Sequence, residues 1–233
     1  MNDDELRRIA REVRKDIVTA VHAAKSGHPG GSLGSADIVT YLYFEEMNVD
    51  PADPRKADRD LFVLSKGHCA PALYAVLAEK GYFPKEDLKT LRHIGSHLQG
   101  HPNMNDTPGV DMSTGSLGQG ISAAVGMALS SKTFGPERRV YALLGDGEVE
   151  EGQVWEASMF AGNHGLDNLT VIVDHNGLQI DGSIEEVNSA MPIADKFRAF
   201  KFHVVEVADG NDMAQIRAAL AEARATKGQP TCI

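Results

Sequence analysis

Asp146 and Asn176 are the side chains of this 233-residue sequence whose types and spacing best suit a metal ion. Asp146 follows the apolar run 139–144, and Asn176 follows the next apolar run, 169–173. One crossover of strand, helix and strand takes roughly 30 residues, so both side chains are expected side by side where two parallel strands end. Carboxylate, amide and main-chain oxygens suit Mg²⁺ together with phosphate oxygens, with Ca²⁺ as the alternative.

Three glycine-rich turns are further candidates for ligand binding, because such turns expose backbone N–H groups at the ends of strands. They span residues 26–34, 114–120 and 145–147. None contains the G-x-G-x-x-G pattern, and the third leads into Glu148, Glu150 and Glu151, which would repel a bare pyrophosphate. A nicotinamide-dependent dehydrogenase is therefore disfavoured, and each turn taken alone is more often structural than functional.

Three histidines lie in or beside glycine turns: His28, His68 and His101. Histidine exchanges protons near neutral pH, which suits chemistry on hydroxyl and carbonyl oxygens. The alternative for each is a hydrogen-bonded structural histidine. A zinc site on the spacing of His93, His97 and His101 is disfavoured, because glycines interrupt the helical pattern it requires.

The elements that must position these residues alternate along the chain. We predict an amphipathic helix near residues 6–21 with a solvated basic face, a helix start at Pro84, and a helix capped by Asn211 and ending near Thr226. Strands are predicted at 61–64, 139–144, 169–173 and 203–207, with the opening of another at 229–233, and helices at 70–80, 118–131 and 151–162. Apolar strands that alternate with helices predict an α/β fold with a central parallel sheet and helices on both faces.

Charge and composition narrow the class of protein. The formal net charge is −10, which disfavours nucleic acid as a partner. Cys69 and Cys232 have no metal-binding or disulfide spacing, no apolar run has the length of a membrane span, and the N-terminus is acidic. We therefore expect a soluble, cytoplasmic protein with no membrane partner.

Five motifs in register resemble transketolase, a thiamine-diphosphate enzyme, over essentially the whole chain. They are residues 26–30, 65–68, 100–102, 114–120, and 145–153 with Glu156. The segment from Gly145 to Asn176 resembles the thiamine-diphosphate motif, which opens with Gly-Asp-Gly and closes with Asn. The resemblance is to the N-terminal, diphosphate-binding half, so it implies a single domain over residues 1–233, lacking a short C-terminal extension.

The resemblance also implies roles for individual residues. Asp146, Asn176 and the main-chain oxygen of Leu178 would hold Mg²⁺, which would hold the cofactor diphosphate. His28 and His101 would contact donor and acceptor oxygens, and His68 would reach the diphosphate and the reacting centre. The implied cofactor contacts are His68, Gly115, Ser116, Leu117, Gly147, Glu148, Glu151 and Asn176.

Glu151 has two interpretations. By resemblance it couples, across an interface between chains, to the glutamate that activates the cofactor. The alternative is an acidic residue that stabilises the start of the helix 151–162. Trp155 is expected to serve packing alone.

The chain does not contain the pyrimidine-binding half of a transketolase, which carries the activating glutamate and most of the arginines that bind sugar phosphate. The resemblance therefore implies one subunit of a split transketolase, inactive without a separate C-terminal subunit, with two copies of each chain in a heterotetramer. Together they would transfer a two-carbon ketol unit from a ketose or ketose phosphate to an aldose or aldose phosphate through a thiamine diphosphate carbanion. The alternatives are a subunit of another thiamine-diphosphate enzyme, of dihydroxyacetone synthase or 2-oxo-acid decarboxylase type, and a non-catalytic paralogue.

Overall fold

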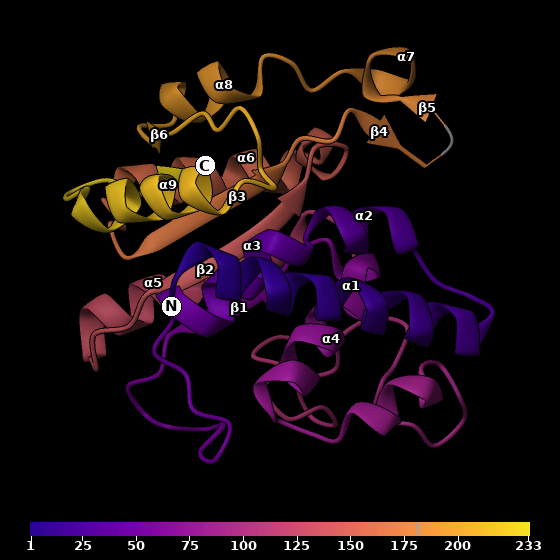
Figure 1. The fold of residues 1–233 in the computed structure, drawn as a ribbon. Helices are drawn as coiled ribbons and strands as arrows, with labels where there is room; N and C mark the ends of the chain where they lie inside the picture. Colours follow the sequence, from indigo (N-terminus) through magenta and orange to yellow (C-terminus); the bar gives the residue numbers. More distant parts are fainter. Residues whose placement is uncertain (181) are drawn as a thin grey trace.

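The computed structural model describes residues 1–180 and 182–233 and is built around a five-stranded parallel sheet (Figure 1). The strand order is β1-β2-β3-β7-β6. The strands are β1 (Leu61–Leu64), β2 (Val140–Gly145), β3 (Leu169–Asp174), β6 (His203–Val204) and β7 (Thr231–Cys232). The predicted α/β fold with a parallel sheet is confirmed.

Alternating side chains divide the buried residues into two layers, one on each face of the sheet. In β1, Phe62 and Leu64 join one hydrophobic cluster, whereas Leu61 and Val63 join the other. The register Leu61↔Val140 continues this division into β2. Both faces of the central strands are therefore buried, which explains why their sequences read as continuous apolar runs.

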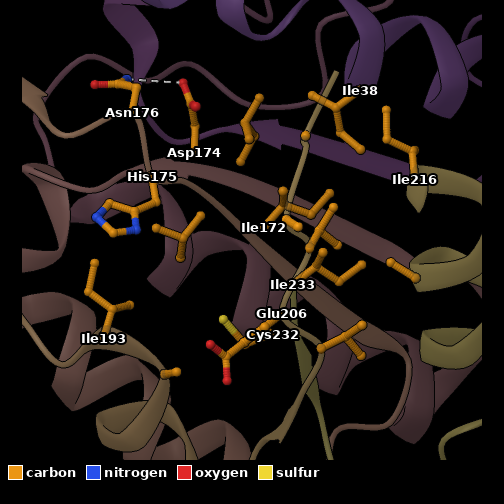
Figure 2. Close-up of a pocket in the computed structure, with 18 of the residues that line it drawn as sticks. Ile38, Ile172, Asp174, His175, Asn176, Ile193, Glu206, Ile216, Cys232 and Ile233 are labelled. Atoms are coloured by element: carbon orange, nitrogen blue, oxygen red, sulfur yellow. Dashed lines mark hydrogen bonds between the residues drawn. The ribbon is translucent and has the colours of Figure 1, made fainter. Parts of the chain in front are cut away.

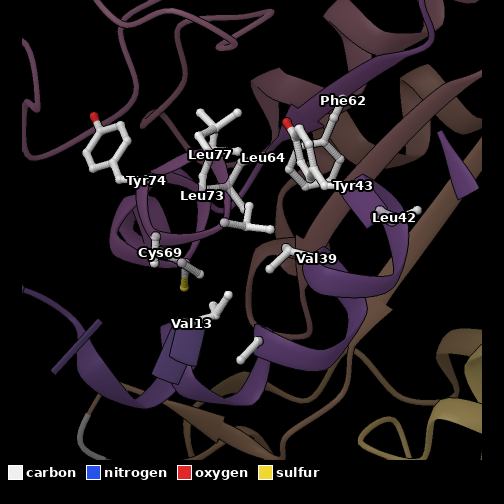
Figure 3. Close-up of a cluster of buried hydrophobic side chains, with 14 of the residues drawn as sticks. Val13, Val39, Leu42, Tyr43, Phe62, Leu64, Cys69, Leu73, Tyr74 and Leu77 are labelled. Carbon is white, nitrogen blue, oxygen red and sulfur yellow. The ribbon is translucent and has the colours of Figure 1, made fainter. Parts of the chain in front are cut away.

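Helices α1 (Asp3–Ala24), α3 (Ala36–Tyr41), α4 (Ala70–Lys80) and α9 (Met213–Ala225) cover the first face. Figure 3 shows Val13 of α1, Val39 of α3 and Leu73 of α4 gathered beside the β1 side chains. The start of α1 is fixed by a capping box, in which Asn2 and Glu5 each accept a hydrogen bond from the other's backbone N–H.

Helices α5 (Gln119–Phe134), α6 (Gly152–Asn163) and α8 (Ile193–Ala199) contribute to the cluster on the second face. Small residues let α5 approach the sheet closely: a Cβ atom at Gly120 would lie 2.7 Å from the Cα atom of Ser65. The first turn of α5 is thereby held against the end of β1, where the second glycine-rich turn meets the sheet.

Short elements connect these layers and occupy the ends of the sheet. Among them are α2 (Pro29–Gly34), the π-helix η1 (Leu42–Glu46), the 3₁₀ helices η2 (Gly67–Cys69), η3 (Lys85–Thr90) and η4 (Glu148–Glu150), the β4–β5 hairpin (Leu178–Gln179 and Gly182–Ser183) and α7 (Ile184–Asn188). Within the described residues, the model has no helix both long and apolar enough to cross a membrane.

Three element predictions need correction. The segment that begins at Pro84 is a 3₁₀ helix, and the strand predicted at 203–207 is only two residues long. The N-cap of α9 is Asp212, whose side chain accepts hydrogen bonds from the backbone N–H groups of Ala214 and Gln215. Asn211 instead donates to the carboxylate of Asp37 and to the carbonyl of Gly34, which ties α9 to the α2–α3 segment.

Candidate functional site

The residues predicted to bind metal lie at the carboxyl ends of β2 and β3. Asp146 follows β2 and is only 2% exposed. Its Oδ2 accepts a hydrogen bond of 2.6 Å from the backbone N–H of Gly177, and its Oδ1 accepts one of 2.9 Å from Gly147. The bond from Gly177 brings the segment that follows Asn176 against the buried carboxylate, as the crossover spacing predicts.

A tight turn folds residues 176–178 at this edge. The Oδ1 atom of Asn176 accepts a 2.9 Å hydrogen bond from the N–H of Leu178, while Gly177 takes a φ of +74°. Such a turn uses the asparagine side chain to replace a backbone contact. Asn176 and Leu178 are both exposed, whereas Asp146 lies beneath them.

The donor set of this edge fits a hard divalent cation. A buried carboxylate, an amide oxygen and a main-chain carbonyl are the oxygen ligands that Mg²⁺ and Ca²⁺ accept. Across residues 1–180 and 182–233, no three side chains of His, Cys, Asp or Glu converge on a metal position. A cation here would therefore depend on the amide and main-chain oxygens, and on ligands supplied from outside the chain.

The carboxylate of Glu148 accepts hydrogen bonds that connect three of the sequence motifs. Its Oε1 accepts hydrogen bonds from Ser65 Oγ at 2.5 Å and Gly118 N at 2.9 Å, and its Oε2 accepts one from Gly145 N at 3.1 Å. The side chain is almost wholly buried, and burial raises the pKa of its carboxyl group. Glu148 therefore lies behind the turns that it connects, and its predicted contact with a cofactor stays a prediction.

Glycines allow the turns 65–68, 100–102 and 114–118 to touch one another. A Cβ atom at Gly67 would lie 2.7 Å from the backbone N of Gly115, and one at Gly115 would lie 2.9 Å from the ring of His101. Gly115 also has a φ of +144°, which disfavours any side chain. Thr114 Oγ1 donates to the carbonyl of Leu64 and so fixes this turn to the end of β1.

The three candidate catalytic histidines form one cluster. The rings of His28 and His68 meet edge to face with centroids 5.1 Å apart. Burial, and to a smaller extent the neighbouring His28, Lys66 and His101, lower the pKa of His68 to about 4. Burial lowers the pKa of His101 as well, with smaller contributions from Arg92 and His28. His68 and His101 are therefore held neutral near pH 7, a state in which imidazole both donates and accepts hydrogen bonds.

The remaining predicted contacts surround this cluster. Leu117 is 36% exposed, and Ser116 is exposed beside it. Glu151 is exposed at the N-terminus of α6, where its side chain makes no capping hydrogen bond, and a Cβ atom at Gly118 would lie 2.8 Å from its Cβ. A Cβ atom at Gly147 would lie 3.0 Å from the side chain of Gln179, so the backbone of this glycine packs closely against β4.

His97, one of the residues considered for zinc, has a structural environment. Its Nε2 lies 3.2 Å from a carboxylate oxygen of Asp87, and its ring packs edge to face on Phe83. These contacts hold the 90–98 loop against η3 and against Phe83, which precedes η3.

Two charged residues of the site were missed by the sequence analysis. Lys66 Nζ lies 2.5 Å from Asp174 Oδ2 and 3.4 Å from the carbonyl oxygen of Gly31. The Lys66 side chain is only 2% exposed. Lys66 lies in the motif 65–68 and Asp174 follows the run 169–173, and both positions indicate a place near the site. Sequence alone does not reveal that a lysine is buried.

Asp174 and Asn176 are also among the residues that line a cavity of about 410 Å³ (Figure 2). Its walls are largely apolar and include Ile38, Ile172 and Ile216. His175 lines this cavity as well.

Comparisons with known proteins place this geometry in context. Residues 6–233 match the family model described as transketolase, thiamine diphosphate binding domain. The 6-deoxy-6-sulfo-D-fructose transketolase subunit SqwG of Clostridium sp. (strain MSTE9) is 46% identical over 229 residues, which are 98% of this chain and 83% of that protein. An apulose-4-phosphate transketolase subunit of Phocaeicola vulgatus is 44% identical over 203 residues, 87% of this chain and 72% of that protein.

The fold of a solved structure agrees. Transketolase from Leishmania mexicana superimposes with a TM-score of 0.94 at 40% identity and covers 98% of this chain. The chain spans only 36% of the length of that protein, whereas it spans most of the two relatives above.

Proposed function

This chain belongs to the transketolase family, in the part described as the thiamine diphosphate binding domain, and on that premise we propose that it is the diphosphate-holding subunit of a split transketolase. The reaction proposed is transfer of a two-carbon ketol unit from a ketose to an aldose. One observation carries the proposal: the buried Asp146, with the turn 176–178 folded against it, lies at the same sheet edge as the motifs that carry the three histidines.

In this proposal Asp146, Asn176 and the main-chain oxygen of Leu178 hold Mg²⁺, with Ca²⁺ as the alternative ion. A chain of net charge −10 does not favour a diphosphate at long range. A divalent cation on these oxygens supplies the missing positive charge locally.

Thiamine diphosphate, when bound, supplies the carbanion that carries the two-carbon unit. The chain's own residues bind and orient the reactants. His28 and His101 exchange protons with sugar oxygens, and the neutral His68 reaches the reacting centre. The further contacts proposed for the cofactor are Gly115, Ser116, Leu117, Gly147, Glu148 and Glu151.

We assign the pyrimidine-binding half, with its activating glutamate, to a separate C-terminal subunit. Support comes from the two relatives whose names describe them as transketolase subunits. Glu151 is exposed beside the 114–118 turn and is the residue proposed to meet that glutamate. The proposed assembly has two copies of each chain, acts on sugars or sugar phosphates, and is cytoplasmic.

Calorimetry of thiamine diphosphate binding to this chain, with and without Mg²⁺, tests the proposal. We expect binding that requires the cation and weakens at least tenfold in Asp146→Asn. Asp106→Asn, at an exposed acidic residue in the 103–106 turn, is the matched control and should bind as the wild type does. Binding that is as tight without a divalent cation, or no binding to the natively folded chain, would contradict the proposal.

A further inference from the structure

The buried lysine of the site makes an ion pair that spans the end of β2. Lys66 follows β1 and Asp174 ends β3, so their strands flank β2 on either side. A Cβ atom at Gly145, the last residue of β2, would lie 3.8 Å from Cδ of Lys66. The lysine stem therefore passes beside a residue without a side chain and reaches the carboxylate beyond it. Burying an ammonium group without a partner costs free energy, so the ion pair with Asp174 is what allows Lys66 to be buried here.

The same carboxylate oxygen also holds the side chain of Asn176. Asp174 Oδ2 accepts a hydrogen bond from Asn176 Nδ2 at 3.3 Å, which is the dashed contact in Figure 2. Lys66 Nζ donates to this oxygen from another direction. One carboxylate thus receives a donor from each of two motifs.

This contact determines which end of the Asn176 amide faces away from Asp174. An amide group has donor hydrogens on nitrogen and lone pairs only on oxygen. With Nδ2 held by Asp174, the Oδ1 atom is directed to the N–H of Leu178 and keeps a second lone pair. If the amide rotated by half a turn, its NH₂ group would take the place of the oxygen, and an NH₂ group is no metal ligand.

We propose that Lys66 and Asp174 are positioning residues, which hold the Asn176 amide in the orientation that a cation requires. This inference rests on the proposed function, since it assumes that Asn176 binds metal. Lys66 neutralises Asp174 beneath the site, and Asp174 orients the ligand, in the way that outer contacts of metal sites commonly do. Lys66 Nζ contacts Asp174 and the Gly31 carbonyl, and the role proposed for it is to act through Asp174.

Two double variants separate orientation from charge. Lys66→Met with Asp174→Leu removes both charges and the acceptor for Asn176. Lys66→Met with Asp174→Asn also removes both charges but keeps an acceptor oxygen at position 174. Neither variant leaves Lys66 or Asp174 charged without the other, so both avoid the cost of breaking this ion pair on one side only.

The readout is Mn²⁺ affinity, measured by electron paramagnetic resonance with thiamine diphosphate in excess. The leucine variant should bind Mn²⁺ about 10–100-fold more weakly, in the range known for outer contacts of metal sites. The asparagine variant should stay within a few-fold of the wild type. At saturating Mn²⁺, both should bind thiamine diphosphate as the wild type does, because the proposal gives Lys66 no direct contact with the diphosphate.

A measurement on the wild-type chain does not depend on whether the variants fold. In ¹⁵N spectra, the side-chain NH₂ of Asn176 should exchange with water more slowly than that of the exposed Asn105. Equal Mn²⁺ affinities for the leucine variant and the wild type, equal losses in both variants, or exchange of the Asn176 NH₂ as fast as that of Asn105 would overturn the inference. Failure of the wild-type chain to bind Mn²⁺ and cofactor would instead contradict the proposed function.

Discussion

The protonation of His68 is determined by its surroundings. The ring is largely buried and has His28, Lys66 and His101 as neighbours, each of which opposes a positive charge. The unfolded chain binds this proton near pH 6.5, whereas the folded chain binds it only near pH 4. The free energy of unfolding therefore decreases as the pH falls from about 6.5 to about 4, because the unfolded chain takes up this proton first.

We predict that His68 stays neutral from pH 8 down to about pH 5 in the free chain. A titration followed by ¹H–¹⁵N spectra of the imidazole should give a midpoint about two units below that of an ordinary histidine, because burial disfavours the charged ring. A midpoint near 6.5 for His68 would show that the cluster is solvated and would remove the basis for its proposed role.

Glu148 shows what sequence reasoning can and cannot resolve for a single residue. Its position in the motif 145–153 predicted a cofactor contact. The structure places its carboxylate inside, as the acceptor for Ser65, Gly118 and Gly145. A glutamate in a glycine-rich turn has the same sequence signature whether it faces a ligand or the interior.

Glu148→Gln should destabilise the chain by about 1–3 kcal/mol, since an amide nitrogen in place of one oxygen leaves a buried donor without its acceptor. Chemical denaturation measures this difference. Glu137→Gln, at an exposed position before β2, should change the free energy of unfolding by less than about 0.5 kcal/mol. If both variants unfold alike, Glu148 does not connect the three motifs energetically.

At the scale of elements, the long periodic segments were predictable and the short ones were not. The runs that became β1, β2 and β3 are apolar because both of their faces are buried. Of the strand predicted at 203–207, only His203 and Val204 are in register with the equally short β7, and the N–H of Val205 donates one further hydrogen bond to the carbonyl of Cys232. The β4–β5 hairpin, which carries Leu178, consists of two-residue strands and has no periodicity to detect.

Three elements meet at a cluster of charged residues where pH should affect stability. Asp16 of α1 and Glu79 of α4 lie beside Lys85 of η3. Burial, and then a hydrogen bond with Glu79, raise the pKa of Asp16 to about 6. A carboxyl group with a raised pKa favours folding when protonated, so its contribution is lost as the pH rises from about 4 to 6.

Asp16→Asn should therefore raise the melting temperature at pH 7 and flatten its dependence on pH between 4 and 6. Thermal unfolding across this range tests the prediction. The comparison is Glu86→Gln, at an exposed carboxylate in η3, which should leave the pH profile unchanged. A lower melting temperature for Asp16→Asn at pH 7 would mean that its ion pair with Lys85 outweighs its burial.

For the whole molecule, the meeting of distant motifs at one sheet edge was predictable from crossover spacing. Asp146 and the segment beyond Asn176 are joined by a hydrogen bond, as that spacing predicts. The buried pairing of Lys66 with Asp174 was not predictable, because it depends on the stem of a lysine from β1 passing the end of β2. Side-chain paths of this kind depend on packing in three dimensions.

The central claim is that this chain holds one half of a transketolase site and needs a second kind of chain to act. The decisive measurement is transfer of a two-carbon unit from a ketose to an aldose, in the presence of thiamine diphosphate and Mg²⁺. It compares this chain alone, a candidate C-terminal subunit (which carries the pyrimidine-binding glutamate) alone, and the two mixed. We predict transfer only in the mixture, with a maximum at equimolar chains and loss of activity with Asp146→Asn. Transfer by this chain in isolation would contradict the proposal. So would a mixture whose transfer activity is unchanged by Asp146→Asn.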